Sequence, residues 1–228
     1  MMQTSRTNWK EELFIISIAT APFIYLAIVW EQLPANMPVH FNWKGEVDDF
    51  TAKSNILLIL FSIISITNLL LKFANKIDPK LSNTEIGASF FKIRIIVAMF
   101  TSALAADVIS ASFLDEYQNG NLLIFISGLF FTLFGNYLPK ISANYFIGIR
   151  TPWTLENATV WKKTHILGGK LLFVGGIAIM AMVWFIPSAY KPFLLLGIIV
   201  PVAMVTMAYS YYIYKKEEQK MNLQEFEK

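Results

Sequence analysis

Few side chains in this 228-residue sequence are of the types that carry out chemistry. There is no cysteine, which excludes disulfides, thiolate metal sites and a cysteine nucleophile. The two histidines, His40 and His165, fall on opposite faces of a membrane by the charge pattern described below, so they cannot share a site. The HExxH, GxSxG and phosphate-binding glycine-rich patterns do not occur. We therefore expect no catalytic residues and no enzymatic activity.

One acidic stretch could bind a cation. His40 is followed by Glu46, Asp48 and Asp49, and imidazole and carboxylate groups are common metal ligands. No fixed metal-ligand spacing is present, however, and the neighbouring aromatic residues favour a loop that rests at a membrane surface. We interpret these side chains as parts of a solvated loop, and we expect neither a metal nor a cofactor.

Asp107 lies within a long apolar run, where an ionisable side chain is costly and often marks an ion or substrate pathway. Together with glycine and proline interruptions in other runs, it leaves a small-molecule or ion transporter open as an alternative function. The favoured interpretation places Asp107 about 20 Å from Arg94 along one helix, at 1.5 Å per residue, and hence near the outer interface.

The elements that must position these residues are membrane-spanning helices. The sequence is 55% hydrophobic and 15% charged, with a mean hydropathy of +0.50, unlike a soluble domain. Lipid offers no partner for backbone polar groups, and the apolar runs lack the alternation of barrel strands. We therefore predict an all-α, polytopic membrane helix bundle with six transmembrane helices. The six runs are 13–30, 55–71, 93–114, 122–138, 166–186 and 192–214.

The basic residues indicate the orientation of these helices. If both termini and the second and fourth connections face one side, that side holds 16 of the 19 lysines and arginines. The opposite side keeps only Lys44, Lys53 and Lys191, with six acidic residues. Because cytoplasmic loops are enriched in lysine and arginine, we predict that both termini are cytoplasmic. The same pattern, with no compact basic domain, indicates no direct contact with nucleic acid.

Two connections are long enough to do more than join helices. The outer loop, residues 31–54, belongs to an N-terminal membrane half that we assign to residues 1–115. The inner loop, residues 135–169, belongs to a C-terminal membrane half that we assign to residues 116–228.

The inner loop contains signals for a helix start. Thr154 is a suitable N-cap, and Glu156 in the first turn would suit the helix dipole. Four following residues share one face, which predicts a short amphipathic helix in the inner headgroup region. Arg150 lies in an apolar context, where a cation usually needs a partner or a phosphate. The four residues of the shared face are Leu155, Ala158, Trp161 and His165.

Both loops resemble parts of one known family. The inner string "GIRTPWTL" and its neighbours resemble the signature of the SdpI family of bacterial immunity proteins. The outer stretch "LPANMPVHFNWKGEVDDF" resembles the uncharacterised domain that precedes this signature in many members. The inner residues that carry the resemblance are Gly135, Asn136, Lys140, Asn144, Gly148, Arg150, Thr151, Pro152, Trp153, Thr154 and Trp161, and the outer ones are Pro38, His40, Trp43, Gly45 and Asp48.

The resemblance implies a multi-pass protein of the bacterial plasma membrane that protects a producing cell from its own secreted antimicrobial peptide. It implies that the outer residues contact this peptide and that the inner residues bind a partner. It also implies a second role as a signalling receptor, in which a small DNA-binding autorepressor is held at the membrane.

Overall fold

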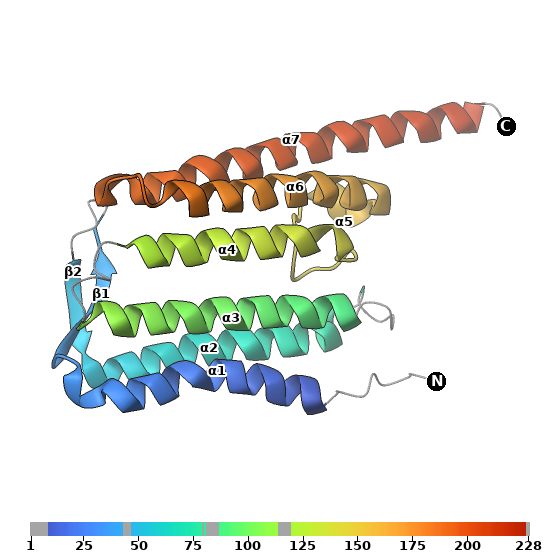
Figure 1. The fold of residues 1–228 in the computed structure, drawn as a ribbon. Helices are drawn as coiled ribbons and strands as arrows, with labels where there is room; N and C mark the ends of the chain where they lie inside the picture. The colour runs from blue at the N-terminus through green and yellow to red at the C-terminus, as the bar shows by residue number, and fades with distance from the viewer. Residues whose placement is uncertain (1–8, 43–46, 79, 81–86, 114–119, 227–228) are drawn as a thin grey trace.

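The computed structural model describes residues 9–42, 47–78, 80, 87–113 and 120–226 (Figure 1). In this part of the chain, six helices are long and apolar enough to cross a membrane. Successive long helices run in opposite directions, as alternating crossings of a bilayer require. These observations confirm the predicted all-α polytopic membrane bundle.

The long helices follow the apolar runs but extend beyond them. A run of apolar residues marks the part that meets lipid, whereas backbone hydrogen bonding continues into the polar flanks. The largest differences are at the end of the sixth span, where the helix continues to Phe226 and the predicted run ended at residue 214, and at the start of the fifth, where the helix begins at Ala158 and the predicted run began at Ile166. The long helices are α1 (Trp9–Val29), α2 (Lys53–Ile77), α3 (Gly87–Ala111), α4 (Asn121–Tyr137), α6 (Ala158–Met182) and α7 (Lys191–Phe226).

Short elements join the long helices at the two ends of the bundle. We call the end where α1 begins and where α7 leaves the bundle the terminal end, and the opposite end the hairpin end (Figure 1). The short helices are η1 (Trp30–Gln32), η4 (Leu138–Lys140), α5 (Pro152–Glu156) and η5 (Ser188–Tyr190). Which of these ends faces the cytoplasm stays a prediction.

The outer loop contains a two-stranded antiparallel hairpin, β1 (Asn36–Phe41) and β2 (Val47–Ala52). The sequence predicted only a surface loop here, in which Pro34 and Pro38 impose extended or turn geometry. The ladder is irregular, with register shifts on both sides of His40. Met37 is fully buried and packs with residues of α1 and α2, so the hairpin is fixed on the end of the bundle.

The first three long helices pack around a shared core at the hairpin end. Tyr25 of α1 and Ser110 of α3 are hydrogen bonded at 2.9 Å between their hydroxyl oxygens. At the terminal end, the carboxylate of Glu12 accepts two hydrogen bonds from Arg94, at 2.6 and 3.1 Å, and lies 3.2 Å from Lys72. One acid from α1 thus holds a cation from α3 and another from α2.

Glycines bring α4 and α6 into close contact. A Cβ at Gly135 would lie 2.7 Å from the carbonyl oxygen of Gly169, and one at Gly169 would lie 2.6 Å from the oxygen of Gly135. Two turns further along, Gly128 faces Gly176 in the same way. Small residues at such crossings let helices approach closely in a membrane, where there is little hydrophobic drive for association.

The first three helices meet the last three where α3 packs on α4. Phe100 stacks on Phe130 with ring centroids 4.3 Å apart. Asp107 follows Phe100 by about two helical turns, so it lies on the same face of α3, near the hairpin end. Only 7% of Asp107 is exposed, and its Oδ1 has no hydrogen-bond partner in the described part of the chain.

Candidate functional site

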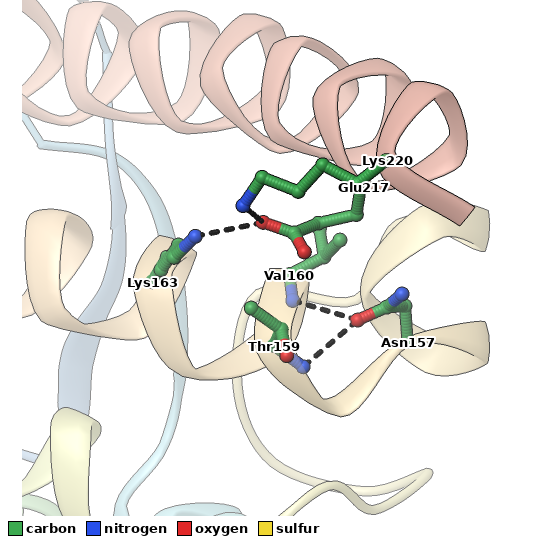
Figure 2. A network of polar contacts seen from close by, with 6 residues as sticks. All are labelled: Asn157, Thr159, Val160, Lys163, Glu217 and Lys220. Atoms are coloured by element: carbon green, nitrogen blue, oxygen red, sulfur yellow. Dashed lines mark hydrogen bonds and ion pairs between the residues drawn. The ribbon is translucent and has the colours of Figure 1, made fainter. Parts of the chain in front are cut away.

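The connection between η4 and α6, residues 141–157, is a folded structure, and we call it the signature segment. Its helix α5 starts with a capping box: Thr151 Oγ1 accepts from the Thr154 backbone N–H at 3.2 Å, and Thr154 Oγ1 accepts from the Thr151 N–H at 2.9 Å. Pro152 follows the cap, where its missing N–H costs nothing. Asn157 then caps α6 by accepting from the N–H groups of Thr159 and Val160 (Figure 2).

The prediction of an amphipathic helix that starts at Thr154 is therefore wrong. Thr151 and Asn157 are the N-caps, and Glu156 is the last residue of α5. The second half of the predicted apolar face lies against protein, since Trp161 is 3% exposed and His165 is fully buried, whereas Ala158 is exposed. Helical periodicity identified a buried face correctly but could not say whether lipid or protein covers it.

A histidine holds the middle of the signature segment. The backbone N–H of Ile149 donates to Nε2 of His165 at 3.0 Å, while Nδ1 lies 2.8 Å from the carbonyl oxygen of Trp161. Because Nε2 accepts, Nδ1 carries the proton and donates. The indole of Trp161 stacks on the imidazole, with ring centroids 3.9 Å apart. Its Nε1–H donates to the Ile141 carbonyl at 2.8 Å.

Gly148 makes this packing sterically possible. Its φ of +124° lies in a region that side chains rarely adopt. A Cβ at this position would overlap Nε2 of His165 and would lie 3.1 Å from the ring of Trp161. The glycine of the "GIRTPWTL" string is thus required both by its backbone conformation and by the ring that it covers.

Asn144 is fully buried and organises the turn before Gly148. Its Nδ2 donates to the carbonyls of Ser142 and Ile147, both at 2.9 Å. Its Oδ1 accepts from the N–H groups of Phe146 and Ile147, at 2.8 and 2.7 Å. A side chain with both a donor and an acceptor end is needed for this pattern, which an aspartate could not reproduce.

Two residues of the α2–α3 connection also bind the signature segment. Asp78, 3% exposed, accepts from the backbone N–H of Tyr145 at 2.6 Å and from that of Lys80 at 2.8 Å. Lys80 donates to the carbonyl of Leu155 and lies over the ring of Tyr145, 4.8 Å from its centroid. Sequence reasoning missed both residues, because nothing in their local pattern distinguishes them from a solvated charged turn.

The partner of Arg150 is a backbone carbonyl group. Its guanidinium donates to the carbonyl of Tyr145, within the signature segment, and the residue is exposed. The expected partner is thus a backbone carbonyl, and the described part of the chain shows no ion pair of Arg150 with an acid. A guanidinium has five N–H donors, so donors remain for a further ligand.

The signature segment is also attached to α7. Thr151 Oγ1 lies 3.1 Å from Oγ of Ser210, and the ring of Trp153 packs against Tyr211 with centroids 5.0 Å apart. Beyond the segment, Lys163 of α6 lies 2.9 Å from Glu217, as Figure 2 shows. At about 1.5 Å per residue α7 is longer than a bilayer core needs, and its end projects past the bundle in Figure 1.

The predicted inner residues therefore divide into two kinds. Some lie inside the protein or in a helix contact and support the fold: Gly135, Asn144, Gly148, Thr151, Thr154 and Trp161. Others are wholly or partly accessible and can meet a partner: Asn136, Lys140, Arg150, Pro152 and Trp153. Tyr145 and Phe146, 45% and 36% exposed, extend this accessible surface beside Arg150, so it offers aromatic rings and a cation.

The predicted outer residues lie at the other end of the bundle. Pro38 pairs with Phe50 across the hairpin, and Nδ1 of His40 is 2.5 Å from Oδ1 of Asp48, with both side chains exposed. Trp43 and Gly45 lie outside the described residues. Where the structure describes the chain, no group of three histidine or acidic residues could hold a metal ion.

Comparisons with known proteins find similarities to both regions. Residues 140–210 match the SdpI/YfhL protein family, and residues 17–65 match a domain of unknown function, DUF1648. The chain is 24% identical to the immunity protein SdpI of Bacillus subtilis (strain 168) over 208 residues, 91% of this chain and 97% of that protein. No solved structure matches. These matches confirm the resemblance to the SdpI family and identify residues 140–210 as the SdpI/YfhL family region of a multi-pass bacterial membrane protein.

Proposed function

We propose that this protein is an immunity protein that protects its cell against a secreted antimicrobial peptide. The observation that carries the proposal is the similarity to immunity protein SdpI along nearly the whole of both chains. The two predicted contact regions lie at opposite ends of the bundle, which suits a protein that meets a peptide on one side of a membrane and a partner on the other. We also propose that the chain consists of two membrane halves, residues 1–115 with the outer loop and residues 116–228 with the inner loop.

Helix α2 offers a route between the two ends. β2 leads directly into α2, and residues just after α2 bind the signature segment through Asp78 and Lys80. A peptide that moves the hairpin would shift the far end of a stiff helix, and with it the turn at Tyr145. We propose that peptide binding favours one of two arrangements of this joint.

The test is expression of the full chain in a sensitive bacterium, challenged with a panel of secreted cationic and amphipathic peptides. We expect a higher inhibitory concentration for at least one peptide. Arg150→Glu should remove this protection without loss of protein from the membrane, because Arg150 is exposed and its loss leaves the core unchanged. Lys162→Glu, an exposed charge reversal on α6, is the matched control and should protect normally. Sensitivity to every peptide, at normal expression, would overturn the proposal.

A signalling role would use the accessible inner residues. We propose that a small DNA-binding autorepressor binds the surface formed by Tyr145, Phe146 and Arg150, because its rings and cation are accessible at the membrane surface. Co-expression with a helix-turn-helix repressor encoded beside the gene, followed by fractionation, tests this. The repressor should move to the membrane fraction when peptide is added, and it should stay soluble with Arg150→Glu. A repressor that stays soluble with the wild-type chain would contradict the proposal.

Transport remains a second candidate because of Asp107. A carboxyl group with an unpartnered oxygen within a membrane helix is often part of an ion or substrate pathway. Under this alternative, vesicles containing the protein would show a substrate flux that Asp107→Asn abolishes. Protection that survives Asp107→Asn would instead favour immunity without transport through this residue.

A further inference from the structure

Two lysines from different elements meet at one aromatic ring at the terminal end. Lys92 of α3 lies 5.6 Å from the ring centroid of Tyr137, the last residue of α4, and Lys140 of η4 lies 5.0 Å from the same centroid. Their Nζ atoms can therefore be no further apart than the sum of these distances, 10.6 Å. Both lysines are exposed, and the ring is partly exposed.

Several cations at this end are paired with acids. Arg94 and Lys72 share Glu12, and Lys163 is held by Glu217. In the described part of the chain, no carboxylate lies within ion-pair distance of Lys92 or Lys140. The ring face attracts each ammonium group but cancels neither charge. The two like charges thus lie at most 10.6 Å apart, and an anion that binds both ammonium groups would offset their repulsion.

The position of the ring identifies the source of the anion. Tyr137 is at the end of the apolar span that covers Asn121–Lys140, so it lies at the level where the bilayer core meets the headgroups. Tyrosine is enriched at this level, and lysines beside it reach the phosphates of the lipid. We therefore expect a lipid phosphate within reach of the two ammonium groups, whereas a soluble phosphate must be captured from dilute solution.

We propose that Lys92, Tyr137 and Lys140 form a binding site for the headgroup phosphate of an anionic phospholipid, at the junction of α3 and α4. The two ammonium groups contact the phosphate, and the tyrosine ring holds both of them close to one point of the surface. The bound lipid would bridge the first three helices and the last three. This proposal does not depend on the immunity function, and it gives Lys140 a role that the packing of the signature segment leaves open.

The test uses the full chain in neutral detergent, titrated with phosphatidylglycerol or with zwitterionic phosphatidylcholine, with bound lipid counted by native mass spectrometry. We expect a phosphatidylglycerol site that phosphatidylcholine does not fill. Lys92→Gln and Lys140→Gln should each weaken it about fivefold, and the double variant about 25-fold, from the contribution of a lysine near an anionic surface. Tyr137→Leu removes the ring that holds both lysines, and it should weaken phosphatidylglycerol binding by a factor similar to that of the double variant.

Lys162→Gln is the control, because Lys162 is equally exposed but lies on α6, away from the ring. Equal weakening by Lys162→Gln would show that phosphatidylglycerol responds only to total charge, and it would overturn the site. Unchanged affinity in the double variant would do the same. Inorganic phosphate in large excess should not displace the lipid, and displacement would show that the site takes a soluble phosphate ligand instead.

Discussion

Replacement of Gly148 by alanine tests the core of the signature segment most directly. The new methyl group would overlap Nε2 of His165, the atom that accepts the hydrogen bond from the Ile149 N–H. It would also press on the ring of Trp161 and would place an alanine at a φ of +124°. Either the imidazole moves and the hydrogen bond breaks, or the backbone turns toward negative φ and the segment shifts.

The expected cost has two parts. A side chain in such a backbone region costs about 1–3 kcal/mol. Breaking the hydrogen bond leaves the imidazole nitrogen and the Ile149 N–H without a partner, which costs about 1–3 kcal/mol more. The free energy of unfolding should therefore fall by about 2–6 kcal/mol, a large fraction of the 5–15 kcal/mol that is typical of folded proteins.

Two other glycines separate these contributions. Gly120 has a φ of +69° but open space where a Cβ would lie, so Gly120→Ala should cost only the backbone strain. Gly197 in α7 also has open space, and its φ is not positive, so Gly197→Ala should be neutral or slightly stabilising through helix propensity.

The measurement is reversible unfolding of the purified protein in detergent micelles, followed by tryptophan fluorescence and circular dichroism. The reasoning requires the order Gly148→Ala, then Gly120→Ala, then Gly197→Ala, from most to least destabilised. If Gly148→Ala were no worse than Gly120→Ala, the contact with His165 would contribute nothing, and the described packing would be incorrect.

Three further changes should behave differently from one another. Gly176→Ala should lower the melting temperature markedly, because its Cβ would overlap the backbone oxygen of Gly128 and would force α4 from α6; thermal unfolding in detergent measures this. Asp78→Asn should cost about 1–3 kcal/mol in a denaturant titration, because the amide can accept only one of the two N–H bonds that the carboxylate accepts. Glu217→Gln should lower the melting temperature less than Gly176→Ala, and by less again in high salt, because its lysine partners are solvent-accessible.

Hydropathy predicted the fold because burial in lipid is a property of whole runs. Six runs of sufficient length could only be helices, and six long helices form in the structure. The ends of helices depend on single hydrogen bonds instead. Thr151, Thr154 and Asn157 are all plausible N-caps by residue type, and only the chain geometry decides that the first and the last of them cap helices.

The contacts of the candidate site were harder to predict because they join distant parts of the sequence. Asp78 binds the N–H of Tyr145, and Glu12 binds Arg94, yet no local pattern in either pair indicates its partner. The family signature pointed to the inner region, which overlaps the residues that match the SdpI/YfhL family, but could not say which of its residues are buried. Arg150 shows the limit of composition rules, since a backbone carbonyl within the same loop accepts its hydrogen bond.

The division of the signature residues into buried and accessible ones changes how mutations in the signature string should be interpreted. Loss of function after a change at Asn144 or Trp161 reports that the segment no longer folds, because both side chains are buried and hydrogen bonded to backbone groups of the segment. The same holds for Gly148, where any side chain would overlap His165 and press on Trp161. Loss of function at Arg150 reports something else, since the side chain is exposed and its removal breaks only one hydrogen bond, to a backbone carbonyl. A partner-binding surface must therefore be mapped with substitutions whose unfolding free energies equal that of the wild type. Arg150 is the residue of the "GIRTPWTL" string that best meets this condition.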